Sequence, residues 1–122
     1  MSHRDPLQAV RIALAGLVYL LRSESSARMN LLATSIVVLL GLFLRISLNE
    51  WRWILLCIAL IWVAEAFNTA IERLGDAVTL EQDPNVGHAK DLSAAAVSLA
   101  LVFGGLICLS ILGPHLVSWL SS

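Results

Sequence analysis

One apolar run near the end of the chain limits what this sequence can fold into. The residues from Leu92 to Leu112 include no charged side chain, and a helix of about 20 apolar residues crosses the hydrocarbon core of a bilayer. Hydrophobic residues make up 58% of the 122 residues and charged residues only 14%, whereas soluble domains carry about a quarter charged residues. A soluble fold of this length could not bury so much apolar surface. The sequence therefore predicts an all-α integral membrane protein built as a single domain.

Three spans are predicted in all. The first covers about residues 29–48, provided that Arg45 extends its charged end to the far interface. The second covers about residues 51–72, after a short turn. The third covers about residues 90–112, and Gly113-Pro114 is expected to end it and leave a short tail.

The first apolar segment, about residues 7–24, is too short to be a span. Its apolar core of about ten residues is half of what a bilayer requires. Arg11 and Arg22 flank that core. An amphipathic helix lying on the membrane surface is the favoured interpretation, and a plain packing helix is the alternative.

The basic residues predict the orientation. Four arginines, beginning with Arg4, precede the first span, and Arg73 and Lys90 lie between the second and third spans. Only Arg45 and Arg52 mark the opposite side. The positive-inside rule then places the N-terminus and residues 72–91 in the cytoplasm, at the inner membrane. The net charge of −1 gives no positive electrostatic potential that would attract nucleic acid.

A stripe of polar side chains follows the second span toward the cytoplasm. Glu65, Asn68, Glu72 and Asp76 are spaced by three, four and four positions, so a helix would present them on one face. Ionisable side chains at membrane depth are costly and usually functional. The stripe is therefore where a function is sought.

Three roles compete for Glu65, the deepest member of the stripe. It could form a structural ion pair, although the sequence offers no Lys or Arg at similar depth. It could relay protons in a transporter, although a second column of carboxylates is missing. It could instead be a catalytic carboxylate acting as a general base near the interface.

Further charged residues are predicted at the same membrane face. Glu24 and Arg28 lie between the surface helix and the first span, and Lys90 and Asp91 precede the third span. Mg²⁺ prefers hard oxygen ligands shared with phosphates, and Lys or Arg neutralise a transferring phosphoryl group. The set suits phosphoryl transfer from a nucleotide to a lipid hydroxyl. Because no P-loop or protein-kinase motif is present, helices would have to form the nucleotide site.

Two motifs resemble those of the prokaryotic diacylglycerol kinase family, which includes the undecaprenol kinases. Residues 65–72 read EAFNTAIE and residues 89–97 read AKDLSAAAV. The NEW at 49–51 resembles the undecaprenol kinase branch, and Gly16 followed by Glu24 and Arg28 is a weaker match. The likeness covers about residues 8–113.

The resemblance implies a homotrimeric lipid kinase with sites between subunits at the cytoplasmic face, using ATP and Mg²⁺ on a membrane lipid alcohol. Glu65 would be the base that takes the hydroxyl proton. Glu24 and Glu72 would hold metal and nucleotide, and Asn68 would orient groups at the reacting centre. The remaining nucleotide contacts would come from Asp76, Lys90 and Asp91.

Two positions depart from the family pattern. Asn30 stands where Glu or His is usual, and Gly75 lies inside a helix that it could loosen.

Both diacylglycerol and undecaprenol remain candidate substrates. The alternative function is that of a non-catalytic membrane subunit that uses Glu65 structurally or for proton passage.

Overall fold

The computed structural model describes residues 5–122 and consists of four helices joined by short connections. Helix α1 spans Pro6–Ser23, α2 spans Ser25–Leu44, α3 spans Leu48–Val78 and α4 spans Pro84–Leu120. The described part contains no strand. Helices α2, α3 and α4 are each long and apolar enough to cross a membrane. The predicted all-α class with three candidate spans and an N-terminal helix is confirmed. Arg4, used above for the orientation, lies outside the described residues.

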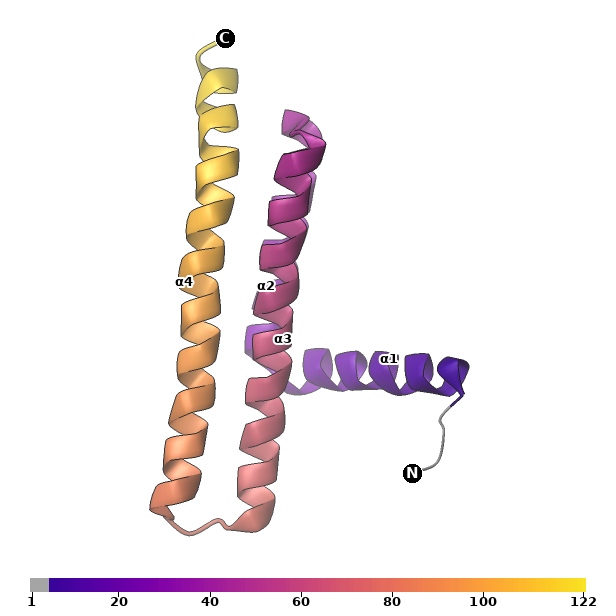
Figure 1. Cartoon of the computed structure of the whole chain (residues 1–122), viewed down its shortest axis with the longest axis vertical. Coiled ribbons are helices and arrows are strands. Elements are labelled where there is room, and N and C mark those ends of the chain that lie inside the picture. Colours follow the sequence, from indigo (N-terminus) through magenta and orange to yellow (C-terminus); the bar gives the residue numbers. More distant parts are fainter. Residues whose placement is uncertain (1–4) are drawn as a thin grey trace.

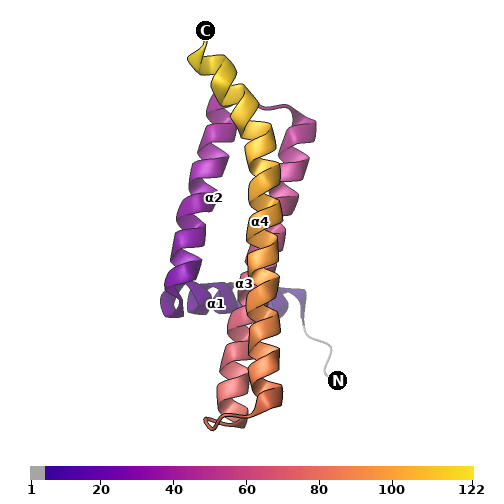
Figure 2. The same cartoon turned by 90° about the vertical axis from the view of Figure 1, so that its left-hand side faces the viewer.

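Helix α1 runs across the bundle, roughly perpendicular to the other three helices (Figure 1). It begins with Asp5 as N-cap, whose side chain accepts a hydrogen bond from the Leu7 amide, and with proline at the first position. The hairpin end of α3 and α4 extends beyond the level of α1 (Figures 1 and 2). This arrangement fits a surface helix, with a polar hairpin projecting past the interface into water.

The connection between α2 and α3 covers residues 45–47, slightly earlier in the chain than the span bounds predicted. Helix α2 ends at Leu44 rather than near residue 48, because Arg45 adopts a left-handed conformation with φ of 53°. Ser47 then caps α3 in a capping box: its hydroxyl accepts from the Glu50 amide, and the Glu50 carboxylate accepts from the Ser47 amide. The capping box starts the next helix within the predicted turn.

The connection between α3 and α4 follows the capping rules closely. Asp83 is the N-cap of α4 and accepts hydrogen bonds from the amides of Asn85 and Val86, at 2.8 and 3.2 Å. Pro84 occupies the first helical position, where its missing N–H costs nothing. Because α3 continues to Val78, the two helices form a long antiparallel hairpin with the most extensive contacts in the fold.

The prediction that Gly113-Pro114 ends the last helix is wrong. Helix α4 continues through Pro114 to Leu120. The residues beyond the proline are held by tertiary contacts: His115 lies 3.0 Å from the Glu50 carboxylate, and the Trp119 ring meets Phe43 edge to face. Membrane helices tolerate proline where neighbours support the interrupted backbone.

The buried core lies at the end of the bundle opposite the hairpin. Ile46, Ile54 and Leu112 form its centre. Elsewhere many large apolar side chains are exposed, for example Leu39 at 65% and Leu109 at 68%. Apolar exposure on this scale indicates that lipid or other protein chains cover the surface.

Candidate active site

The predicted polar stripe lies along one continuous helix. Glu65, Asn68, Glu72 and Asp76 all belong to α3. Glu65 is only 5% exposed and accepts a hydrogen bond from the Ser26 hydroxyl of α2. No ion pair to Glu65 occurs within residues 5–122. A buried carboxylate held by one hydroxyl, with no paired cation, suits proton transfer better than a structural ion pair.

Asn68 connects the stripe to α4. The Ser93 hydroxyl lies 2.7 Å from the Asn68 side-chain oxygen and 2.9 Å from the Lys90 carbonyl oxygen. A serine hydroxyl has one hydrogen, so it donates to one of these oxygens at a time. Ser93 is buried, and it thereby fixes the Asn68 amide relative to the backbone that carries Lys90.

Lys90 reaches two members of the stripe. Its ammonium lies 2.6 Å from an Asp76 oxygen and 3.5 Å from a Glu72 oxygen. Gly75 makes this approach possible, because a Cβ at Gly75 would stand 2.9 Å from Lys90 Cε. The hydrogen bond from Lys90 and its positive charge hold the pKa of the Asp76 carboxyl below its ordinary value.

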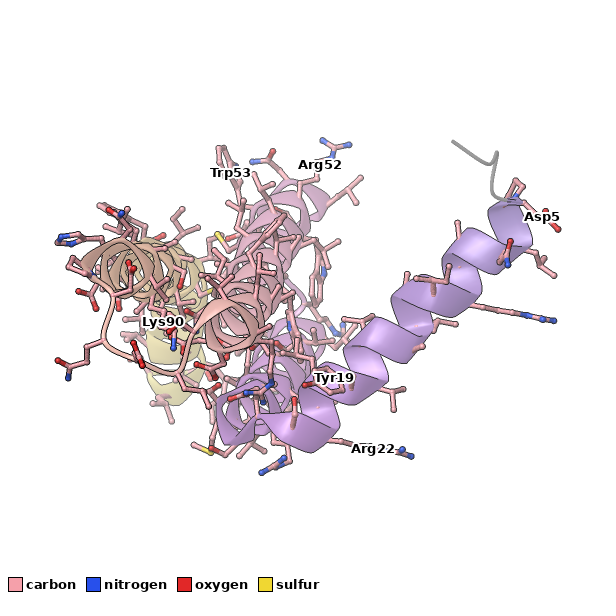
Figure 3. The ribbon with its side chains drawn as sticks, turned by 90° about the horizontal axis from the view of Figure 1, so that it is seen from below. Asp5, Tyr19, Arg22, Arg52, Trp53 and Lys90 are labelled. Atoms are coloured by element: carbon pink, nitrogen blue, oxygen red, sulfur yellow. The ribbon has the colours of Figure 1, made fainter. Side chains whose placement is uncertain are left out.

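A second cation, Arg73, joins α3 to the start of α2 and to α1. Its Nη2 donates to the Glu24 carboxylate and its Nε donates to the Tyr19 hydroxyl, both at 2.8 Å. Viewed toward the hairpin end, Tyr19 points from α1 toward the bundle and Lys90 lies between α3 and α4 (Figure 3). Arg28 follows Glu24 by four positions, and its guanidinium donates to the carbonyls of Leu21 and Arg22 rather than to a carboxylate.

An apolar pocket of about 540 Å³ opens beside Glu65. Helices α2, α3 and α4 all contribute to it, and its polar atoms come from Glu65, Asn68, Asn30 and Ser26. Its apolar lining consists of Met29, Ala33, Ala94, Val97 and Leu101. The Asn30 side-chain nitrogen is the one buried side-chain polar atom that lacks a hydrogen-bond partner among the described residues. A pocket of this character suits a lipid whose polar group sits at the carboxylate.

The predicted site residues are brought together only in part. Glu24, Glu72, Asp76 and Lys90 each take part in an ion pair at the α1 and hairpin side, whereas Asp91 is exposed and has no hydrogen bond or ion pair within the described range. Over that same range, no three acidic, histidine or cysteine side chains gather as a metal cage. Mg²⁺ commonly needs just one or two carboxylates plus substrate phosphates, so two separate carboxylates are compatible with it.

Four residues that contact the predicted site residues or their neighbours escaped the sequence interpretation. Ser26, Ser93 and Tyr19 were not singled out, and Arg73 was counted only for orientation. The signal for Ser93 was available, because it lies three positions after Lys90 on a helix. The partners of Glu65 and Glu24 come from other helices, so spacing along one helix could not reveal them.

A buried carboxylate beside an apolar pocket, with ion pairs nearby on helices long enough to span a membrane, is typical of a membrane enzyme that joins a charged group to an apolar acceptor. Comparison with known proteins identifies the class more closely. The family described as Prokaryotic diacylglycerol kinase matches residues 11–112. The chain belongs to this family and is an ATP-dependent lipid kinase.

Two characterised relatives agree with this assignment. The undecaprenol kinase of Bacillus subtilis (strain 168) is 34% identical over 95 residues, which cover 78% of this chain and 77% of that protein. The diacylglycerol kinase of Pseudomonas aeruginosa (strain PAO1) is 32% identical over 95 residues, with the same shares covered. The kinase interpretation is therefore favoured over a non-catalytic membrane subunit.

Proposed function

We propose that this protein transfers the γ-phosphate of ATP to the hydroxyl of a membrane lipid alcohol at the cytoplasmic face of the inner membrane. The bond between the lipid oxygen and the γ-phosphorus forms while the bond from that phosphorus to the β-γ bridging oxygen breaks, and ADP leaves. The observation that carries the proposal is a continuous set of contacts from the Glu65 pocket, through Asn68 and Ser93, to Lys90.

Glu65 acts as the general base in this proposal. It lines the apolar pocket, so a lipid hydroxyl that enters the pocket can meet its carboxylate. The hydroxyl proton passes to Glu65 as the phosphoryl group is transferred. The Ser26 hydroxyl holds the carboxylate in position, and Asn68, on the next turn of α3, orients the acceptor oxygen or the phosphoryl group.

The nucleotide binds at the hairpin side of the pocket. Lys90 contacts its phosphates, with Asp76 and Asp91 supporting the nucleotide site. Asp76 and Glu72 hold Lys90 near α3. The bulk of the nucleotide requires space, and a second pocket of about 540 Å³ lies beside Lys90, lined by the α3–α4 connection.

Glu24 and Glu72 are the carboxylates proposed to hold Mg²⁺ together with the nucleotide phosphates. Their oxygen donors and small number match the usual protein contribution to a magnesium-nucleotide site. The bound ion would offset negative charge on the phosphates during transfer. Glu24 is paired with Arg73, and Glu72 is paired with Lys90.

The active form is proposed to be a homotrimer with sites between subunits, as the family resemblance implies. The exposed apolar side chains of α2 and α4 leave ample surface for such contacts. A subunit interface would also explain why Asp91 has no partner within the described chain.

The acceptor is either diacylglycerol or undecaprenol, and one experiment separates them. Purified protein is incubated with ATP labelled on the γ-phosphate, with and without Mg²⁺, and with each lipid in turn. We expect label in one lipid product at a rate at least tenfold above the other. Absence of label in both lipids would contradict the proposed function.

A further inference from the structure

Arg73 is a second cation beside the stripe, and it pairs with a carboxylate that Lys90 does not contact. Lys90 binds Glu72 and Asp76 from α4. Arg73 binds Glu24 at the junction of α1 and α2. Its charge also contributes to the lowered pKa of Asp76. Between them, the two cations pair with three carboxylates.

The charges of this group do not suit a nucleotide as they stand. Three carboxylates and two cations leave one net negative charge, and the phosphates of a nucleotide are themselves negative. A nucleotide can bind only when the carboxylates have gained a metal ion or the cations are released toward the phosphates.

We propose that Arg73 is a second phosphate-binding cation of the nucleotide site, held by Glu24 until a divalent metal ion takes that carboxylate. The inference rests on the proposed function, because it assigns Glu24 to the metal ion. Metal binding at Glu24 frees the guanidinium, which then contacts the nucleotide phosphates opposite Lys90. Arginine suits this role because its planar fork can make two parallel hydrogen bonds to a phosphate.

The Arg73–Glu24 contact has the properties of an exchangeable pair. The side chains are 46% and 31% exposed, and ion pairs this accessible to water contribute little to stability. A doubly charged metal ion competes effectively for the carboxylate, and a phosphate offers Arg73 a stronger partner than it loses. The exchange therefore requires no rearrangement of the helices.

A purely structural role for Arg73 predicts something different. Through Tyr19 and Glu24 it also ties α1 and the start of α2 to α3. If that anchor were its only function, loss of Arg73 would loosen α1 and lower the thermal stability without a specific effect on nucleotide or metal binding.

The test measures binding of the ATP analogue AMP-PCP and of Mn²⁺ to the full chain in detergent or nanodiscs, with AMP-PCP followed by calorimetry and Mn²⁺ by electron paramagnetic resonance. For Arg73→Gln we expect AMP-PCP affinity in the presence of Mg²⁺ to fall by about tenfold. Without nucleotide, we expect Mn²⁺ to bind about twofold to fivefold more tightly, because Glu24 has lost its competing cation. Arg73→Lys keeps the positive charge, so its affinities for AMP-PCP and Mn²⁺ should lie between those of the wild type and those of Arg73→Gln.

Two variants serve as controls. Tyr19→Phe removes the hydroxyl that links Arg73 to α1 but keeps the guanidinium, so it should leave both affinities within twofold of wild type. Arg22→Gln removes an arginine whose side chain extends away from the bundle (Figure 3), and it controls for the loss of one positive charge on this face.

The inference is overturned if Arg73→Gln binds AMP-PCP and Mn²⁺ as tightly as the wild type does. It is also overturned if Tyr19→Phe lowers the affinity for AMP-PCP as much as Arg73→Gln does. Should the glutamine variant not fold, wild-type affinities in Arg73→Lys overturn it instead. Failure of the proposed function would give a different result: the wild-type protein would label no lipid in the transfer assay, regardless of the binding results for the Arg73 variants.

Discussion

At the scale of single residues, Glu65 is the side chain whose position most needs a functional explanation. A carboxylate that is 5% exposed is costly to bury, and its only hydrogen-bond partner within the described chain is Ser26. An alanine or leucine would stabilise the same position of an apolar helix at lower cost. The open pocket beside Glu65 supports the proposed catalytic role, since an apolar acceptor bound there would meet the carboxylate.

The first prediction concerns the charge of Glu65. Replacing the carboxylate by an amide in Glu65→Gln keeps size and hydrogen bonding to Ser26, but removes the proton acceptor. We expect kcat to fall by about 10²- to 10⁴-fold, the usual contribution of a general base. Labelled phosphate transfer measures the loss, and size-exclusion chromatography checks that assembly is unchanged. Asp5→Asn, at the exposed start of α1, is the matched control because asparagine also caps a helix, and near-normal turnover in Glu65→Gln would reject the assigned base.

The second prediction concerns Glu72. In Glu72→Ala we expect the Mg²⁺ concentration for half-maximal activity to rise several-fold, because one proposed carboxylate ligand is lost. A titration of activity with Mg²⁺ at saturating ATP measures this. The KM for the lipid is the internal control and should stay unchanged. An identical metal response in the variant and the wild type would argue against ligation by Glu72.

At the scale of helices, the α3–α4 hairpin brings Lys90, the proposed phosphate-binding residue, to the stripe. The sequence suggested that Gly75 could loosen α3. The structure assigns it a packing role instead, because Gly75 is buried where Val86 and Lys90 cross α3. The absence of a side chain lets the stem of Lys90 lie against the helix while its ammonium reaches Asp76.

The third prediction tests that close approach. In Gly75→Ala the added methyl group would meet Lys90 Cε at 2.9 Å and Val86 Cγ1 at 3.2 Å, so the lysine must shift. We expect the KM for ATP to rise about fivefold to tenfold as Lys90 moves from its site. Thermal stability should change little, because alanine favours the helix by about 1 kcal/mol and offsets part of the strain.

Gly41→Ala is the control for this prediction. A Cβ there would stand 2.7 Å from the rigid Trp51 ring, at the end of the bundle opposite the hairpin. It should lower thermal stability by about 1–3 kcal/mol through overpacking and leave the KM for ATP unchanged. The reverse pattern, with a KM effect only at Gly41, would contradict the role given to Gly75.

Helix periodicity made the stripe on α3 predictable, and capping rules made the start of α4 at Asp83-Pro84 predictable. Both depend on neighbours within a few residues. The Arg73–Glu24 pair joins residues 49 positions apart and depends on how α1 meets α3. The predicted helix end at Pro114 was wrong because it used only the local preference of proline to end a helix. The Trp119–Phe43 contact, which supports the residues beyond Pro114, joins two helices and could not be read from local sequence.

At the scale of the whole molecule, a single chain leaves the proposed active site open to its surroundings. The cluster of buried apolar side chains lies at the end near Ile54, and the pocket at Glu65 opens to the exterior. Within the described range the two proposed metal ligands are held by different cations and no larger acidic cluster forms. Lipid can cover the apolar faces, but it cannot supply charged groups such as Asp91 to the nucleotide. Neighbouring subunits can do both.

The last prediction follows from that incompleteness: activity should track the trimer and not the monomer. Purified protein is moved stepwise from a mild detergent to one that dissociates membrane oligomers, and native mass spectrometry counts the chains in each species. We expect phosphate transfer to fall in proportion to the trimer, while circular dichroism shows that the helices persist. Return to the mild detergent should restore both quantities together, since association re-forms the site. A fully active monomer would show that a single chain holds every group that the transfer needs.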